Sequence, residues 1–97
     1  MKCSSLEEVR ENIDRIDDSI IKLIAERAEY VRQAASFKKD ENGVKAPDRV
    51  KAVLERVGEK ARKYEAPPDI AVTVYKNMIE GFIDLEMDKF SSERGKP

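Results

Sequence analysis

The chain has 97 residues, which is enough for one domain with a modest core. Hydrophobic residues make up 40% of it, charged residues another 40% and aromatic residues only 6%, a composition that favours amphipathic helices with aliphatic stripes. The 19 Lys and Arg residues nearly balance the 20 Asp and Glu residues, for a net charge of −1. We therefore expect neither nucleic acid nor a membrane surface as a partner.

The scarcity of histidine and cysteine excludes several kinds of catalytic and metal site. The chain has no histidine and one cysteine, Cys3, which excludes an internal disulfide, the usual zinc sites and any nucleophile activated by histidine. No metal is expected. No apolar run approaches the roughly 18 residues of a membrane span, and the first residues lack the apolar stretch of a signal peptide. The chain is therefore expected to be soluble and cytoplasmic.

The first predicted helix spans residues 5–39. Apolar residues recur along it at spacings of three and four, the period of an amphipathic helix. Ser5 followed by Glu8 matches a capping box at its start. The apolar positions are Leu6, Val9, Ile13, Ile16, Ile20, Leu23, Ile24, Val31, Ala34 and Ala35.

Prolines indicate where two further helices begin. Pro47 suits the first turn of a helix over 47–65, and Pro68 lies at the start of a helix over 69–90. Both segments carry apolar residues at helical spacing, and no strand pattern or internal repeat interrupts this order. We predict an all-α fold with three helices in a single domain, residues 1–97.

The length of the first helix predicts an oligomer. At about 1.5 Å per residue it spans about 50 Å, whereas a compact chain of this size has a radius of gyration near 12–13 Å. Its apolar stripe runs the whole length, so a second copy in an interlocked helical homodimer is the simplest cover. The alternative is a monomeric three-helix bundle with an overhanging first helix.

Two cations lie within the apolar stripe of the first predicted helix. Arg27 and Lys38 are eleven residues apart, which places them within about 20° of each other on one helical face. Apolar neighbours flank them, and a buried cation is costly unless an opposite charge balances it. A cavity that accepts an anion would supply that charge. The connection that follows, 40–46, is polar and indicates a loop.

A carboxyl group occupies a comparable apolar position in the third predicted helix. Glu86 lies among aromatic and aliphatic neighbours, so it is expected to be partly desolvated. It either forms a salt bridge with Arg27 or Lys38 that sets the helix register, or belongs to a ligand site. Arg49 is either a surface arginine or a ligand residue, and Arg10 either a solvated arginine or a residue that reaches the site across a dimer.

Several segments together resemble the all-helical (AroQ-type) chorismate mutase family. The spacing of Arg10, Arg27, Lys38, Arg49 and Glu86 suits this family over nearly the whole chain. The segments are Leu6–Asp17, Ile24–Arg27, Phe37–Lys38, Asp48–Val50 and Ile79–Glu86.

The resemblance implies an interlocked homodimer and a Claisen rearrangement of chorismate to prephenate, in the shikimate pathway towards phenylalanine and tyrosine. It implies that Arg27 and the Arg10 of a second copy bind the two carboxylates of the substrate, while Arg49 adds positive potential. Lys38 and Glu86 would contact the ether oxygen, where negative charge grows as the bond breaks. Such a reaction requires no cofactor.

Two positions depart from the mutase pattern. Val50 stands where many chorismate mutases have an acidic residue, and Phe82 where the family often has a small polar one; both are expected to line the substrate site. The stretch 46–50 is similar to isochorismate-pyruvate lyase, a family member that forms salicylate and pyruvate. The mutase is the first hypothesis and the lyase the second. A non-catalytic helical dimer that binds an acidic metabolite is the third.

Overall fold

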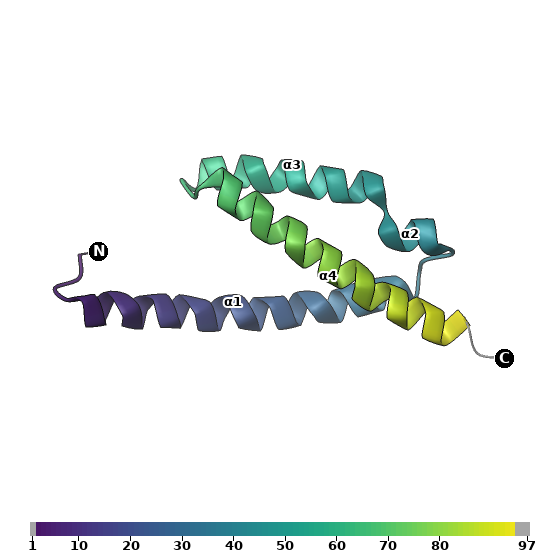
Figure 1. Cartoon of the computed structure of the whole chain (residues 1–97), viewed down its shortest axis with the longest axis horizontal. Helices are drawn as coiled ribbons and strands as arrows, with labels where there is room; N and C mark the ends of the chain where they lie inside the picture. Colours follow the sequence, from purple (N-terminus) through teal and green to yellow (C-terminus); the bar gives the residue numbers. More distant parts are fainter. Residues whose placement is uncertain (1, 95–97) are drawn as a thin grey trace. The chain divides into compact units, whose positions relative to one another are not determined.

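The computed structural model describes residues 2–94 of the chain, with side chains through Ser91. The described part is all-α, which confirms the predicted fold class, and Figure 1 shows the helices along the chain. The helices are α1 (Leu6–Ala35), α2 (Glu41–Lys45), α3 (Pro47–Lys63) and α4 (Pro68–Arg94). The chain divides into two compact units, residues 1–30 and 31–97, and α1 contributes to both. No helix of the described part is both long enough and apolar enough to cross a bilayer.

The start of α1 is capped as the sequence predicts, with one difference. The Ser5 hydroxyl accepts a hydrogen bond from the backbone N–H of Glu8 at 3.1 Å, so the first half of the capping box is present. The Glu8 carboxylate instead accepts hydrogen bonds from Ser4, from its hydroxyl at 2.7 Å and its N–H at 3.1 Å. These bonds lower the pKa of Glu8 and place a negative charge at the positive end of the helix dipole.

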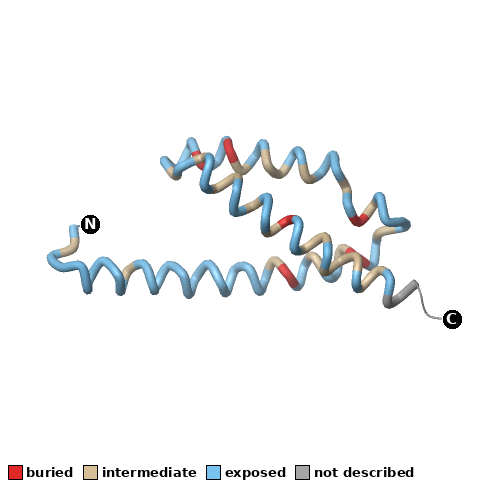
Figure 2. Tube along the Cα trace, in the orientation of Figure 1, coloured by how far each residue is buried: buried red, intermediate tan, exposed pale blue. Residues whose placement is uncertain are grey.

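The apolar face of α1 in the first unit is exposed. Figure 2 shows almost all of this part of the helix as exposed. The large aliphatic residues there are between 39% and 66% exposed: Leu6, Val9, Ile13, Ile16, Ile20, Ile21, Leu23 and Ile24. A monomeric protein seldom leaves so continuous an apolar stripe in water.

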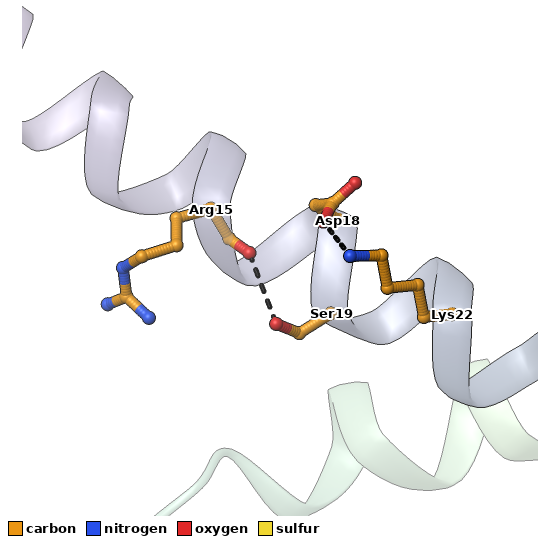
Figure 3. Close-up of polar contacts among 4 residues, drawn as sticks. All are labelled: Arg15, Asp18, Ser19 and Lys22. Carbon is orange, nitrogen blue, oxygen red and sulfur yellow. Dashed lines mark hydrogen bonds and ion pairs between the residues drawn. The ribbon is translucent and has the colours of Figure 1, made fainter.

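Local contacts stabilise the polar face of α1 around residues 15–22. Figure 3 shows Lys22 paired with Asp18 at 3.0 Å, and the Ser19 hydroxyl donating to the Arg15 carbonyl at 3.3 Å. Both side chains of the ion pair are mostly exposed, so the pair adds at most about 0.5 kcal/mol to helix stability.

The first helix ends earlier than predicted. It stops at Ala35, and the predicted helical positions up to residue 39 are not helical. The N–H groups of Ser36 and Phe37 donate to carbonyls three residues back, which closes the last turn tightly. The ammonium of Lys89 in α4 donates a hydrogen bond to the Arg32 carbonyl at 3.0 Å. It thereby satisfies one of the last carbonyls of α1, which lack an N–H partner within the helix.

The polar segment after α1 contains a short helix that the sequence analysis treated as a loop. Asp40 caps α2, and Val44 in its middle is only 2% exposed. Helix α2 packs against α4. It ends at Lys45. The next residue, Ala46, has the left-handed conformation (φ 39°) and is followed by Pro47, the first residue of α3.

Helices α3 and α4 pack against each other as an antiparallel hairpin (Figure 1). Their predicted ranges, 47–65 and 69–90, are close to the observed ones, and α4 continues to Arg94. The connection turns sharply at Glu65, whose φ is 58°, and the Ala66 N–H donates to the Ala61 carbonyl at 2.8 Å. Ala61 and Ile79 are buried in the hairpin. Val44 is buried within α2, and Ala35 at the end of α1.

Candidate active site

Lys38 lies beyond the end of α1, in the segment that leads into α2. Its side chain is half-buried, and its ammonium donates a hydrogen bond to the Gly43 carbonyl at 3.1 Å. The prediction that Lys38 shares a helical face with Arg27 is wrong, because α1 stops at Ala35 and three residues of turn follow. Lys38 is therefore positioned by α2 and not by the periodicity of α1.

Glu86 is a partly desolvated acidic residue of the second unit. It lies near the C-terminal end of α4, and its Oε2 atom is shielded from solvent with no hydrogen-bond partner among the described residues. Burial raises the pKa of this carboxyl above its ordinary value, while the positive charge of Lys38 acts in the opposite direction. The predicted desolvation of Glu86 is thus confirmed, and burial outweighs the lysine.

Lys38 and Glu86 are brought together although 48 positions separate them in the sequence. The positive charge of Lys38 lowers the pKa of the Glu86 carboxyl, which shows that the two groups interact electrostatically. A lysine ammonium donates hydrogen bonds, and so does a carboxyl group in its protonated form. Such a pair is suited to bind an oxygen atom on which negative charge develops.

The start of α3 supplies Arg49 and Val50. Pro47 occupies the first helical position, where its missing N–H costs nothing, and Asp48 lies in the first turn. Arg49 is exposed, whereas Val50 is half-buried. Phe82, one turn before Glu86 on α4, is also half-buried.

Arg10 and Arg27 belong to the first unit. Arg10 is exposed on α1, and Arg27 is half-buried further along the same helix. Their places in a shared site with the residues of the second unit stay predictions.

Two functional candidates escaped the sequence analysis, namely Asp40 and Gly43. The Asp40 carboxylate accepts a hydrogen bond from the Gly43 N–H at 2.7 Å, and the Gly43 carbonyl accepts the Lys38 ammonium. The spacing of three between an aspartate and the N–H that it caps was visible in the sequence as a helix start signal. In the described part no three Cys, Asp or Glu side chains gather as metal ligands do.

Fold and site together define an all-helical protein whose polar centre pairs a lysine with a desolvated carboxyl. The chain matches the model of the chorismate mutase type II family over residues 9–87. It therefore belongs to this AroQ-type chorismate mutase family, as its sequence resemblance predicts.

Named relatives carry more than one activity. The chain is 30% identical over 93 residues to the isochorismate pyruvate lyase of Pseudomonas aeruginosa, which covers 96% of this chain and 92% of that protein. It is 30% identical over 76 residues to the chorismate mutase of Methanocaldococcus jannaschii, covering 77% of each. It is also 28% identical over 85 residues to the bifunctional chorismate mutase/prephenate dehydratase of Aquifex aeolicus, covering 84% of this chain and 24% of that protein.

Proposed function

We propose that this protein is a chorismate mutase, which rearranges chorismate to prephenate. The observation that carries the proposal is the buried Glu86 Oε2 atom, without a hydrogen-bond partner in the described part of the chain, within the electrostatic reach of Lys38. A buried polar atom in this state is costly and is characteristic of a site that a ligand completes. Prephenate formation would place the protein in aromatic amino acid biosynthesis.

The chemistry fits residues that supply charge and hydrogen bonds but no nucleophile. In the rearrangement a carbon–oxygen bond breaks while a carbon–carbon bond forms, so no atom is gained or lost and nothing is oxidised. Negative charge develops on the ether oxygen, and donors already in place there stabilise the transition state more than the substrate. Lys38 is one donor, and Glu86 in its protonated form is the second, which its raised pKa favours.

Arginines are the proposed ligands of the two substrate carboxylates. Arg27 and Arg49 of one chain, with the Arg10 of a second copy, would form this clamp, since the guanidinium group binds carboxylates in bidentate fashion. Val50 and Phe82 would supply its apolar wall, where water is excluded and electrostatic interactions strengthen.

The proposal includes a homodimer, because the site requires Arg10 from a second chain. The apolar face of α1, from Leu6 to Ile24, is 39–66% exposed at its large aliphatic residues. Covering a side chain of this kind contributes on the order of 1.5–3 kcal/mol, so a second copy along this face would gain several such increments.

A second candidate function is that of an isochorismate-pyruvate lyase. The stretch 46–50 favours it, with Val50 in place of an acidic residue, as does the similarity to the Pseudomonas aeruginosa lyase over 96% of the chain. Conversion of isochorismate to salicylate and pyruvate balances when the carbon–oxygen bond breaks and one ring hydrogen moves to the enolpyruvyl fragment. The same clamp and the same donors serve both substrates.

The test is to supply the purified protein with each substrate separately and to identify the products by chromatography. Prephenate from chorismate is the expected result, and salicylate with pyruvate from isochorismate alone would replace the first candidate by the second. The Lys38→Ala variant serves as the control for uncatalysed conversion. Tight binding without turnover of either substrate would contradict both the mutase and the lyase. It would favour the third hypothesis, a non-catalytic dimer that binds an acidic metabolite.

A further inference from the structure

In the segment between α1 and α3, the backbone of one residue, Gly43, forms hydrogen bonds with both Asp40 and Lys38. The Gly43 N–H donates to the Asp40 carboxylate at 2.7 Å, and the Gly43 carbonyl accepts the Lys38 ammonium at 3.1 Å. An anion and a cation thus attach to the two ends of the same residue. The Asp40 carbonyl also accepts the Val44 N–H at 3.2 Å, so backbone and side chain of Asp40 both hold α2.

The aliphatic part of the Lys38 side chain passes close to the Cα atom of Gly43, on the side where another residue would have its Cβ atom. A Cβ atom placed on Gly43 would lie 3.7 Å from the Lys38 Cβ and 3.9 Å from its Cδ, which is ordinary contact distance. It would lie 3.3 Å from the Asp40 Oδ1, which is tighter than usual. The absence of a side chain at residue 43 therefore lets the capping carboxylate of Asp40 approach closely, while the Lys38 side chain passes at ordinary contact distance.

We infer that Asp40 and Gly43 are positioning residues for Lys38, with Asp40 fixing the turn whose Gly43 carbonyl holds the ammonium. The inference rests on the proposed function, in which Lys38 is the main cation at the reacting oxygen. A lysine side chain has many rotamers, and restricting them before the substrate binds lowers the entropy lost in the transition state.

The fold makes Asp40 important because α2 has little else to hold it. A helix of five residues does not form by itself in water, since so few hydrogen bonds cannot offset the cost of nucleation. Besides its cap, α2 has the buried Val44 and its contact with α4. Loss of the cap should loosen the turn at Gly43 while Val44 keeps the segment in place.

Two substitutions of Asp40 separate its hydrogen bond from its charge. Asp40→Asn keeps a side-chain oxygen for the Gly43 N–H, whereas Asp40→Ala removes it, and both remove the negative charge. We expect kcat/KM of Asp40→Ala to fall about tenfold, mostly through kcat, and that of Asp40→Asn to stay within about twofold of the parent. Circular dichroism establishes that each variant is folded. If Asp40→Ala unfolds, Asp40→Gly takes its place, since glycine at a cap costs less.

A substrate-free measurement reports the position of Lys38 directly. Lys38 lowers the pKa of Glu86, so this pKa should rise if the ammonium moves away. The pKa is measured by following the NMR signal of the Glu86 carboxyl carbon as the pH changes. Lys38→Met removes the charge altogether, and the resulting rise in the Glu86 pKa defines the full effect. Asp40→Ala should move the Glu86 pKa towards that limit, whereas Asp40→Asn should not. Ser5→Ala removes a cap of the same type from α1 and should not shift it either.

The outcomes distinguish the inference from the proposed function. The positioning role is overturned if Glu86 has the same pKa in Asp40→Ala as in Asp40→Asn, or if Lys38→Met leaves the Glu86 pKa unchanged. This holds whatever activity the enzyme has. If the expected titrations appear but the parent protein converts neither chorismate nor isochorismate, the proposed function fails and the positioning of Lys38 stands.

Discussion

The two units of the chain contain similar amphipathic helices but differ in what covers them. In the second unit the hairpin of α3 and α4 buries residues such as Ala61 and Ile79. In the first unit Ile13, Ile16 and Ile20, which have the same helical spacing, are 46–50% exposed. An amphipathic pattern thus predicts which face of a helix is apolar, whereas the packing partner depends on the rest of the chain or on another chain.

The largest effect is expected for Lys38→Ala, which removes the lysine that interacts with Glu86 in the second unit and should leave the helix packing unchanged. Lys38→Ala should lower kcat/KM by about 10²–10³-fold, because a donor to the developing charge is lost. The lysine is only half-buried and lies outside the long helices, so the circular dichroism spectrum should be unchanged. Steady-state kinetics with both substrates measure the loss. Retention of most of the activity would contradict the assigned role.

The next effect tests the exposed face of the first unit. Ile16→Glu places a charge in the centre of the apolar stripe and should convert a homodimer to monomers, with loss of activity because Arg10 of the second chain is no longer supplied. Sedimentation velocity at micromolar concentration measures the change. The matched control is Asp18→Ala on the polar face, which removes only an exposed ion pair and should leave the dimer intact. A monomeric parent protein would refute the dimer.

Substitution of Glu86 should change pH dependence. Burial raises the pKa of Glu86, so the neutral donor is lost as the pH rises through that raised value, and kcat/KM should fall with it. Glu86→Gln donates at every pH and should flatten the profile. An identical pH profile in the two proteins would exclude Glu86 as the titrating donor.

The same carboxyl links stability to pH. Since the folded-state pKa lies above the unfolded one, the contribution of Glu86 is complete below the unfolded pKa and is lost as the pH rises through the folded value. Glu86→Gln should therefore raise Tm at neutral pH relative to the parent and not at acidic pH. Melting temperatures measured across this range check the sign.

The smallest effect concerns the outward side of α4. Gly81 lies within this helix, and a Cβ atom there would meet nothing within 4 Å. Gly81→Ala should therefore raise the free energy of unfolding by about 0.5–1 kcal/mol, because alanine has the higher helix propensity. Urea denaturation measures the gain. A loss of stability would indicate that a second copy packs closely against residue 81.

Much of the fold could be predicted from local pattern. Prolines 47 and 68, the Ser5 cap and the three-and-four spacing of apolar residues placed the three long helices, because these signals act within a few residues of chain. The exact end of α1 and the existence of α2 were not predicted, although Asp40 was a possible helix start signal. A five-residue helix has no periodicity to detect, and its stability depends on burial of its own Val44 and on its contact with α4.

By itself, the sequence determined the helical fold class, the apolar side of α1 and the residue types from which a site can be built. Only the tertiary structure decided that Lys38 leaves the helix and donates to Gly43, and that its charge acts on a carboxyl 48 positions away. The physical reason is the range of the interactions. Helix propensity and capping depend on near neighbours, whereas the desolvation of Glu86 depends on segments brought together only by folding.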